Sequence, residues 1–324
     1  MTFNVAGLEE SAQNLVLQGI RKSTKKSYNT AHKVFLKFCK VFALQPLPTS
    51  EKTLLTFTAY LSKKGLSPGA INVYLSAVRN LNVINGYQVT PHRAPRVKLA
   101  LKAVKDSACE PVQKAPITLH ELRVMWKVVQ TACNTHMWQA LLCLAFFGSL
   151  RCAEYTPHTG NPSGPLIKHV TFSADGKTLN YKVTSSKTKT HGFQVSMACS
   201  GDIICAKCRM VDYLHTRAAQ GVSSGESCLF MYKGSPVSAK QVNSFIKSSV
   251  SALGWDPQQF SAHSLRAGAA TTAARAGFQD WELKKLGNWA SSAYTQYIRD
   301  NNHTSQFPRR MARVTKSNGL PAVG

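Results

Sequence analysis

Residues 263–297 carry the side chains of this chain that are best suited to chemistry. His263 and Arg266 are three residues apart, so a helix would place both on one face. Trp289 follows Gly287-Asn288, and Tyr297 comes eight residues after Trp289. Each residue alone has an ordinary structural explanation, because a lone histidine or tryptophan in such a segment more often belongs to the core. Together they offer a proton carrier, a planar cation, an indole donor and a hydroxyl nucleophile.

The segment between these groups is rich in alanine and glycine from Ala267 to Gly277. Small side chains let a helix lie close against another backbone. We therefore expect a buried helix whose His-Arg face is held in a fixed direction.

Two further cationic positions lie upstream in the same order along the chain. The sequence G-S-L-R-C-A-E supplies Gly148, Arg151 and Glu154. The sequence S-S-K-T-K-T-H-G then supplies Lys187, with Lys189 as the nearby alternative.

This ordered set resembles the tyrosine recombinase, or phage integrase, family: an arginine in a G-x-R-x-x-E context, a hairpin lysine, H-x-x-R, G-x-W and a tyrosine. The resemblance extends from about Asn14 to about Ser305, which is nearly the whole chain. It implies that the protein breaks and rejoins DNA, and it implies a role for each matching residue.

The implied roles concern one phosphodiester. Tyr297 would be the nucleophile, and a phosphotyrosine would conserve the bond energy for resealing. Arg151 and Arg266 would hold two non-bridging oxygens with planar forks that lysine cannot reproduce. By the same resemblance, Lys187 would protonate the leaving 5′ oxygen and His263 would help to deprotonate Tyr297.

Two more residues complete the implied site. Trp289 occupies the position where many family members have a second histidine, and its N–H can donate but cannot relay a proton. Glu154 would orient the site rather than react. No step requires a metal or another cofactor, and the motifs contain no pair of carboxylates that could hold Mg²⁺.

The spacing of the last motif indicates a particular group within the family that the sequence resembles. The step from Trp289 to Tyr297 is one residue shorter than in common phage and bacterial members, and G-N-W-A-S-S-A-Y-T-Q-Y-I-R looks like the ending of eukaryotic DIRS and Ngaro-type retrotransposon recombinases. This affiliation implies a nuclear location. Tyr294 is an alternative nucleophile, but Tyr297 precedes Ile-Arg, where the family's nucleophile lies.

Composition indicates a polyanionic partner. The 324 residues include 40 Lys and Arg against 15 Asp and Glu, a net charge of +25. Such a surplus predicts DNA, RNA or an anionic membrane surface as the partner.

The longest apolar stretch, residues 137–150, is too short for a membrane span and is expected to form a core helix. We expect no membrane contact and no secretion, since the N-terminus lacks a signal pattern and nine cysteines form no disulfide framework.

Residues 14–88 are predicted to form a small helical domain. Apolar residues recur at helical spacing in three segments and predict three helices: one that includes Tyr28 and Phe38, one capped by Ser50, and one that starts at Ser67-Pro68. By resemblance this is the core-binding domain, which grips one side of the duplex. The basic residues that we expect to contact DNA phosphates are Arg21, Lys22, Lys25, Lys26, Arg93, Arg96, Lys98 and Lys189.

The remaining sequence predicts a basic linker and a second domain. Prolines bound the basic segment 89–116, which has room for a short helix. Thr118 and Glu121 then form a capping box, with Ile117 and Leu122 as a hydrophobic staple. A buried helix over 137–147 precedes strands from Val170 to Met197, with turns at residues 175–176 and 190–192. Helices are predicted through Val211, Leu214 and Ala218, over 238–253 and over 280–286.

Three cysteines in this domain raise a separate question. Cys199, Cys205 and Cys208 contain one C-x-x-C, which is compatible with zinc, but no second pair follows at finger spacing. This favours structural cysteines over a metal site.

The sequence thus predicts a mainly α protein with a small antiparallel β-sheet. Its parts are a lead-in (1–13), a helical core-binding domain (14–88), a linker (89–116), an α+β catalytic domain (117–305) and a tail (306–324). The expected partner is double-stranded DNA, and the resemblance implies a homotetramer on two duplexes that exchanges C-terminal segments. Two alternatives stay open: a recombinase-derived DNA-binding protein that no longer cuts, and a type IB topoisomerase that nicks and reseals.

Overall fold

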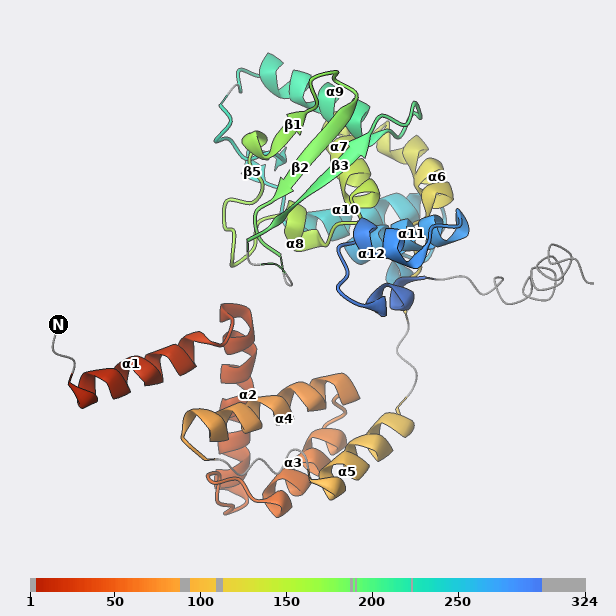
Figure 1. Ribbon diagram of the computed structural model, residues 1–324. Coiled ribbons are helices and arrows are strands. Elements are labelled where there is room, and N and C mark those ends of the chain that lie inside the picture. The colour runs from red at the N-terminus through yellow and green to blue at the C-terminus, as the bar shows by residue number, and fades with distance from the viewer. Residues whose placement is uncertain are drawn as a thin grey trace, which may run out of the picture. The chain divides into compact units, whose positions relative to one another are not determined.

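The computed structural model describes residues 4–87, 94–108, 113–186, 189, 191–222 and 224–298, without the side chains of residues 22 and 23. The chain is mainly helical with a small antiparallel sheet, as the sequence predicts (Figure 1). It divides into two compact units, Met1–Pro111 and Val112–Gly324. Among the described residues, no helix combines the length and apolar character that crossing a bilayer requires.

Unit 1 consists of helices packed around one apolar core. Its helices are α1 (Val5–Gln18), α2 (Lys22–Val41), α3 (Glu51–Lys63), α4 (Pro68–Ile84) and α5 (Pro95–Asp106). Ser50 and Ser67 cap α3 and α4 by accepting hydrogen bonds from backbone N–H groups, which confirms the predicted starts. The apolar stripes of these helices form the core, in which Phe35, Phe57 and Leu75 are fully buried.

Two segments of unit 1 differ from the sequence interpretation. The expected loose lead-in, residues 1–13, lies largely in α1, which is capped by Asn4 and has no buried residue. The short helix for which the expected linker has room is present as α5, but it packs on unit 1, and its Val97 is fully buried in that core. Leu101 and Val104 follow Val97 at helical spacing and pack against the same core, a short apolar stripe that the sequence interpretation did not use.

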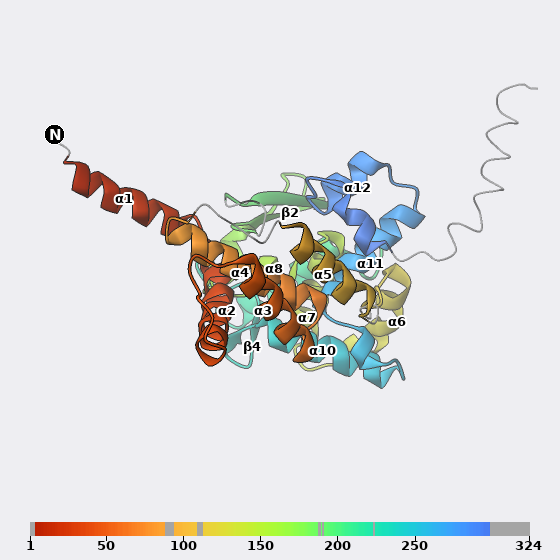
Figure 2. The same ribbon diagram turned by 90° about the horizontal axis from the view of Figure 1, so that it is seen from below.

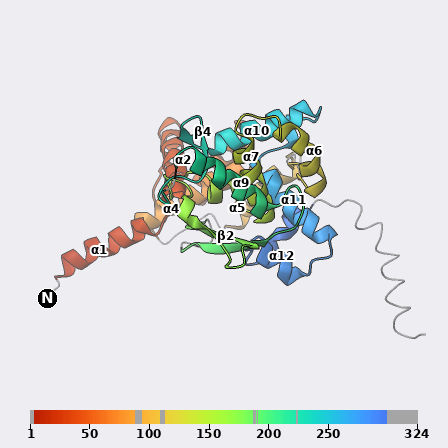
Figure 3. The same ribbon diagram turned by 90° about the horizontal axis from the view of Figure 1, so that it is seen from above.

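Unit 2 is built around the buried helix α7 (Thr135–Phe147). Strands β1 (Val170–Phe172), β2 (Thr178–Val183) and β3 (Phe193–Ala198) form an antiparallel sheet in the order β1-β2-β3. Seen from below and from above, α7 lies between this sheet and α10 (Ala239–Ala252) (Figures 2 and 3). The predicted turn at Asp175-Gly176 joins β1 to β2.

Further elements complete unit 2. They are α6 (Leu119–Val129), α8 (Cys152–Tyr155), η2 (Ile167–His169), α9 (Ala206–Ala219), β4 (Met231–Tyr232), β5 (Ser235–Pro236), η3 (Pro257–Gln259), α11 (Ala262–Arg275), α12 (Asp280–Leu286) and η4 (Ser292–Tyr297). The capping box is present, since the Thr118 N–H donates to the Glu121 carboxylate at 2.8 Å. Ile117 and Leu122 are fully buried, as the predicted staple requires.

The helix predicted through Val211, Leu214 and Ala218 is confirmed as α9, but other residues form its buried face. Met210, Tyr213 and Arg217 are buried, whereas Val211 and Leu214 are only partly buried. The Arg217 guanidinium donates to the carbonyl oxygens of residues 228 and 229 at 3.0 and 2.9 Å, so this polar side chain is satisfied inside the protein. A sequence pattern assigns arginine to the exposed face, because the acceptors that allow its burial lie elsewhere in the chain.

Helix α11 approaches another backbone closely, as its small residues predict. A Cβ on Gly268 would lie 1.6 Å from the carbonyl oxygen of Ile117, so only glycine fits there. The Ile117 N–H donates to the carbonyl oxygen of Ser264 at 2.9 Å, which fixes the start of α11 against the segment before α6. This contact fixes the direction in which the His-Arg face points.

Candidate active site

Arg151 is held at the start of α8 by a buried carboxylate. Glu154 accepts from the Arg151 backbone N–H at 2.8 Å and from its Nη1 at 3.0 Å. The Glu154 side chain is 2% exposed and the Arg151 side chain 21% exposed. Tyr181 on β2 donates to the backbone carbonyl of Glu154 at 2.7 Å, so the sheet also supports this turn. The Arg151 side chain is thus held by Glu154 while it stays partly exposed.

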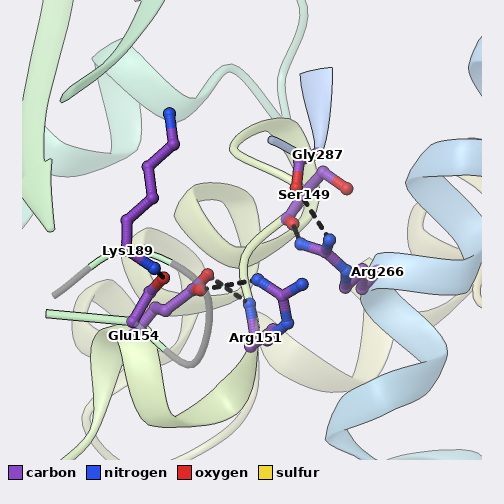
Figure 4. A network of polar contacts seen from close by, with 7 residues as sticks. Ser149, Arg151, Glu154, Lys189, Arg266 and Gly287 are labelled. Atoms are coloured by element: carbon purple, nitrogen blue, oxygen red, sulfur yellow. Dashed lines mark hydrogen bonds and ion pairs between the residues drawn. The ribbon is translucent and has the colours of Figure 1, made fainter. Parts of the chain in front are cut away.

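Arg266 is buried and anchored by two backbone carbonyls. Its Nη1 donates to the carbonyl of Ser149, and its Nη2 donates to the carbonyl of Gly287 at 2.7 Å. Figure 4 shows the Arg266 and Arg151 guanidiniums beside one another near Ser149. Two of the five guanidinium N–H groups thus donate to backbone carbonyls, which fixes the plane of the Arg266 guanidinium.

The electrostatics of this pair fit an anion site. Burial and the neighbouring charge of Arg151 lower the pKa of Arg266 to about 10, although Glu154 and Tyr297 oppose the shift. Arg266 therefore stays charged at neutral pH while it lies only 1% exposed beside a second cation. Two adjacent guanidiniums with one carboxylate leave a net positive site, which a phosphate group would neutralise.

Trp289 packs on Arg266 and presents a donor with no acceptor. The Arg266 Cζ lies 4.2 Å from the centroid of the Trp289 ring. Within the described part of the chain, the buried Trp289 Nε1–H has no hydrogen-bond partner. A Cβ on Gly287 would meet the indole ring at 2.0 Å, which explains the glycine of the G-x-W motif. An unsatisfied buried donor is costly, so an acceptor on a ligand beside Arg266 would satisfy the Trp289 N–H.

Tyr297 lies next to the other groups of the C-terminal motif. Its ring centroid is 5.0 Å from that of His263 and 5.5 Å from that of Trp289. The Arg266 Cζ is also 5.5 Å from the Tyr297 ring. The Thr271 hydroxyl donates to the Tyr297 carbonyl at 3.1 Å, which ties η4 to α11. His263, Lys114 and Tyr297 line an open recess of about 440 Å³.

Tyr294 has a different environment from Tyr297. It is 8% exposed, and its hydroxyl donates to the Asp280 carboxylate. This hydrogen bond, together with burial, raises the pKa of Tyr294. A tyrosine whose oxygen is committed to Asp280 is a poor nucleophile, which favours Tyr297.

The lysine of the predicted site lies outside the described residues. Lys187 belongs to the connection between β2 and β3, where the Ser186 N–H donates to the Lys189 carbonyl at 3.0 Å. Lys189 is described, and Figure 4 shows its side chain extending away from Arg151 and Arg266. Its Nζ lies 5.9 Å from the centroid of the Phe193 ring.

Most of the basic residues expected to contact DNA belong to unit 1. Arg21, Lys25, Lys26 and Lys98 are exposed, and Arg96 lies 3.8 Å from Glu51. Arg93 and the side chain of Lys22 lie outside the described residues. The exposed side chains are accessible to a phosphate backbone.

Sequence reasoning missed the groups that orient Arg266. The carbonyls of Ser149 and Gly287 act through the backbone, which leaves no residue-type signal. The backbone beside both carbonyls is left-handed, with φ of 45° at Ser149 and 53° at Asn288. Such a conformation costs roughly 1–3 kcal/mol for a residue other than glycine, and it turns both carbonyls toward the guanidinium.

Comparison with known proteins identifies this arrangement. Residues 177–304 match the model of the phage integrase family. The fold is similar to the Tn1549 transposon integrase in complex with circular intermediate DNA, with TM-score 0.62, 12% identity and coverage of 92% of this chain and 98% of that chain. None of the curated protein sequences is a significant match.

Two other solved structures share the fold. XerH recombinase bound to palindromic difH substrate has TM-score 0.59 and 15% identity, with 89% of this chain and 78% of that chain covered. A lambda integrase dimer bound to a COC′ core site has TM-score 0.57 and 15% identity, with 93% and 79% covered. The chain therefore has the fold of these recombinases, and its residues 177–304 are similar to the phage integrase family.

Proposed function

We propose that this protein is a site-specific recombinase that cuts and rejoins double-stranded DNA through a 3′-phosphotyrosine intermediate. One observation carries the proposal: buried Arg266 is packed against both Trp289 and Tyr297, and the His263 ring also lies beside Tyr297. The family match and the similarity to recombinases solved on DNA support the same assignment.

The proposed reaction is an in-line exchange at phosphorus. The Tyr297 oxygen attacks, its proton passes toward His263, and a bond forms between that oxygen and phosphorus. The bond to the 5′ oxygen breaks, and Lys187 donates the proton that the departing hydroxyl needs. A 5′ hydroxyl from another strand then attacks the phosphotyrosine in the reverse sense, so the number of phosphoester bonds is unchanged.

The remaining residues stabilise charge on the phosphate. Arg151 and Arg266 face the two non-bridging oxygens, where negative charge increases in the transition state. Their positions are fixed before DNA binds, Arg151 by Glu154 and Arg266 by backbone carbonyls. The Trp289 N–H supplies a further donor. Because these groups supply the charge stabilisation, the reaction needs no metal at the phosphorus.

DNA binding and assembly follow from the same proposal. The net charge of +25 suits contact with many phosphates, including those near Arg21, Lys25, Lys26 and Lys98. Exchange of strands requires more than one active site, and we propose four protomers on two duplexes. The short step from Trp289 to Tyr297 supports an affiliation with DIRS and Ngaro-type elements of eukaryotes, and hence a nuclear location.

Two alternatives use the same fold. A DNA-binding protein that no longer cuts would have no need of an intact set of Arg151, His263, Arg266 and Tyr297. A type IB topoisomerase would use the same groups to nick and reseal, but it would relax supercoils without joining strands from different duplexes. Recombinant joints between two labelled duplexes therefore distinguish the recombinase from both.

The test uses a library of nicked duplexes that lose a short strand end after cleavage and so trap the covalent intermediate. We expect the native protein to form a protein–DNA adduct that survives denaturation and that marks the preferred sequence. Tyr297→Phe should bind the same DNA without forming the adduct, whereas Tyr294→Phe should still form it. Adduct formation by Tyr297→Phe would refute the proposed nucleophile.

A further inference from the structure

Three thiols that are separated in sequence meet between the end of β3 and the start of α9. Cys199 directly follows β3, Cys205 is the N-cap of α9 and Cys208 lies in its first turn. The Cys199 Sγ lies 3.6 Å from the Cys208 Sγ and 3.7 Å from the Cys205 Sγ. All three sulfur atoms lie within 4.8 Å of one another. The C-x-x-C is thus joined by a third thiol, which its spacing alone did not predict.

The spacing of the sulfur atoms matches that of a tetrahedral thiolate site. With a zinc–sulfur bond of about 2.3 Å, two thiolates on one tetrahedral ion are about 3.8 Å apart. A disulfide would require a sulfur–sulfur separation of about 2.05 Å. The observed separations therefore leave room for an ion among the three thiols with little movement of the backbone.

The surroundings define how many ligands the chain supplies. The Ser200 N–H donates to the Cys205 Sγ at 3.4 Å, a contact that stabilises a thiolate. Asp202 is committed elsewhere, because its carboxylate accepts from Arg123 and from the Ile204 N–H. In the part of the chain that the structure describes, no histidine, aspartate or glutamate joins the three thiols. Cys199 is exposed, so a fourth position would open to solvent.

We propose that Cys199, Cys205 and Cys208 bind one zinc ion, with water or another small ligand in the fourth position. Thiolates select soft ions of this class over Mg²⁺ or Ca²⁺. The ion joins the end of β3 to the first turn of α9 and so fixes the base of the hairpin whose opposite end contains Lys187. This site takes no part in the proposed strand transfer, and its occupancy can be measured without DNA.

The test measures zinc binding by the reduced full-length chain, competed against a chromophoric chelator. We expect one zinc per chain, and X-ray absorption should show three sulfur neighbours. Cys199→Ser and Cys208→Ser should each weaken zinc binding by about 100-fold or more, since each removes one of three protein ligands. Cys133→Ser, which removes an exposed thiol elsewhere in unit 2, is the matched control and should bind zinc normally.

Thermal unfolding supplies a second measurement. Zinc should raise the unfolding midpoint of the native protein and of Cys133→Ser, and it should leave that of Cys199→Ser unchanged, because only a ligand of the native state stabilises it. Circular dichroism first establishes that each variant is folded. The proposal would be overturned if the folded, reduced native chain failed to bind one zinc. It would also be overturned if Cys199→Ser and Cys208→Ser bound zinc as tightly as the native chain.

Discussion

Replacing Trp289 by phenylalanine isolates one proposed hydrogen bond to the scissile phosphate. The indole Nε1–H has no acceptor among the described residues, while the ring packs 4.2 Å from the Arg266 Cζ. Phenylalanine keeps an aromatic ring on Arg266 and removes the donor. A hydrogen bond to a charged group contributes about 1.5–3 kcal/mol, so the cleavage rate should fall about 10- to 150-fold.

Trp126 offers a matched control for this change. It is 4% exposed in the core of unit 2, and its Nε1–H also lacks an acceptor within the described residues. Trp126→Phe and Trp289→Phe remove the same atoms from buried positions, so their losses in free energy of unfolding should be similar. Only Trp289→Phe should slow cleavage.

The assay is single-turnover cleavage of a nicked duplex at saturating protein, with stability measured separately by denaturant unfolding. Unchanged cleavage by Trp289→Phe would show that the indole N–H does not contact the phosphate. Equal slowing by Trp126→Phe would show that lost packing, rather than a lost donor, explains the effect.

Three other predictions test the site, the electrostatics and the packing. Arg266→Lys should lower cleavage by about 100-fold or more, because an ammonium cannot hold both backbone carbonyls and the phosphate oxygens; single-turnover rates that stay near native would contradict this. Changing Lys25 and Lys26 to glutamine should reduce the slope of log affinity against log salt by about 2, and an unchanged slope in a binding titration would remove both from the DNA contacts. Gly268→Ala should destabilise unit 2 by about 1–3 kcal/mol in denaturant unfolding, because its new Cβ would overlap a backbone carbonyl. Gly69→Ala, which has open space in α4, should be neutral or stabilising; similar losses in both would refute the packing argument.

The helices of both units could be predicted because their signals are local. Ser50, Ser67 and the capping box at Thr118 mark helix starts within a few residues of sequence, and the structure confirms all three. The buried helix α7 was predicted from one continuous apolar run. Such features depend on neighbouring residues alone, so no knowledge of the fold is needed.

Features that depend on distant partners could not be predicted in this way. Arg217 is buried because carbonyls in another segment accept its hydrogen bonds, and α5 belongs to unit 1 because Val97, Leu101 and Val104 pack on a core formed by the other helices. The residue types of the candidate site could be listed from the sequence. The carbonyls that orient Arg266 could not, since backbone acceptors are the same in every residue.

The cysteine cluster shows the same limit. The sequence interpretation named Cys199, Cys205 and Cys208 and favoured structural cysteines, because no second pair follows at finger spacing. The antiparallel pairing of β2 with β3 determines where β3 ends, and this places Cys199 beside the first turn of α9. The third thiol therefore becomes a neighbour only through the fold.

Identification of the residue that becomes linked to DNA tests the central claim most directly. The covalent adduct trapped on a nicked duplex is digested with protease and nuclease, and the modified peptide is fragmented by mass spectrometry. We predict a nucleotide attached through phosphate to the Tyr297 oxygen. Attachment at Tyr294, or at any other residue, would contradict the account.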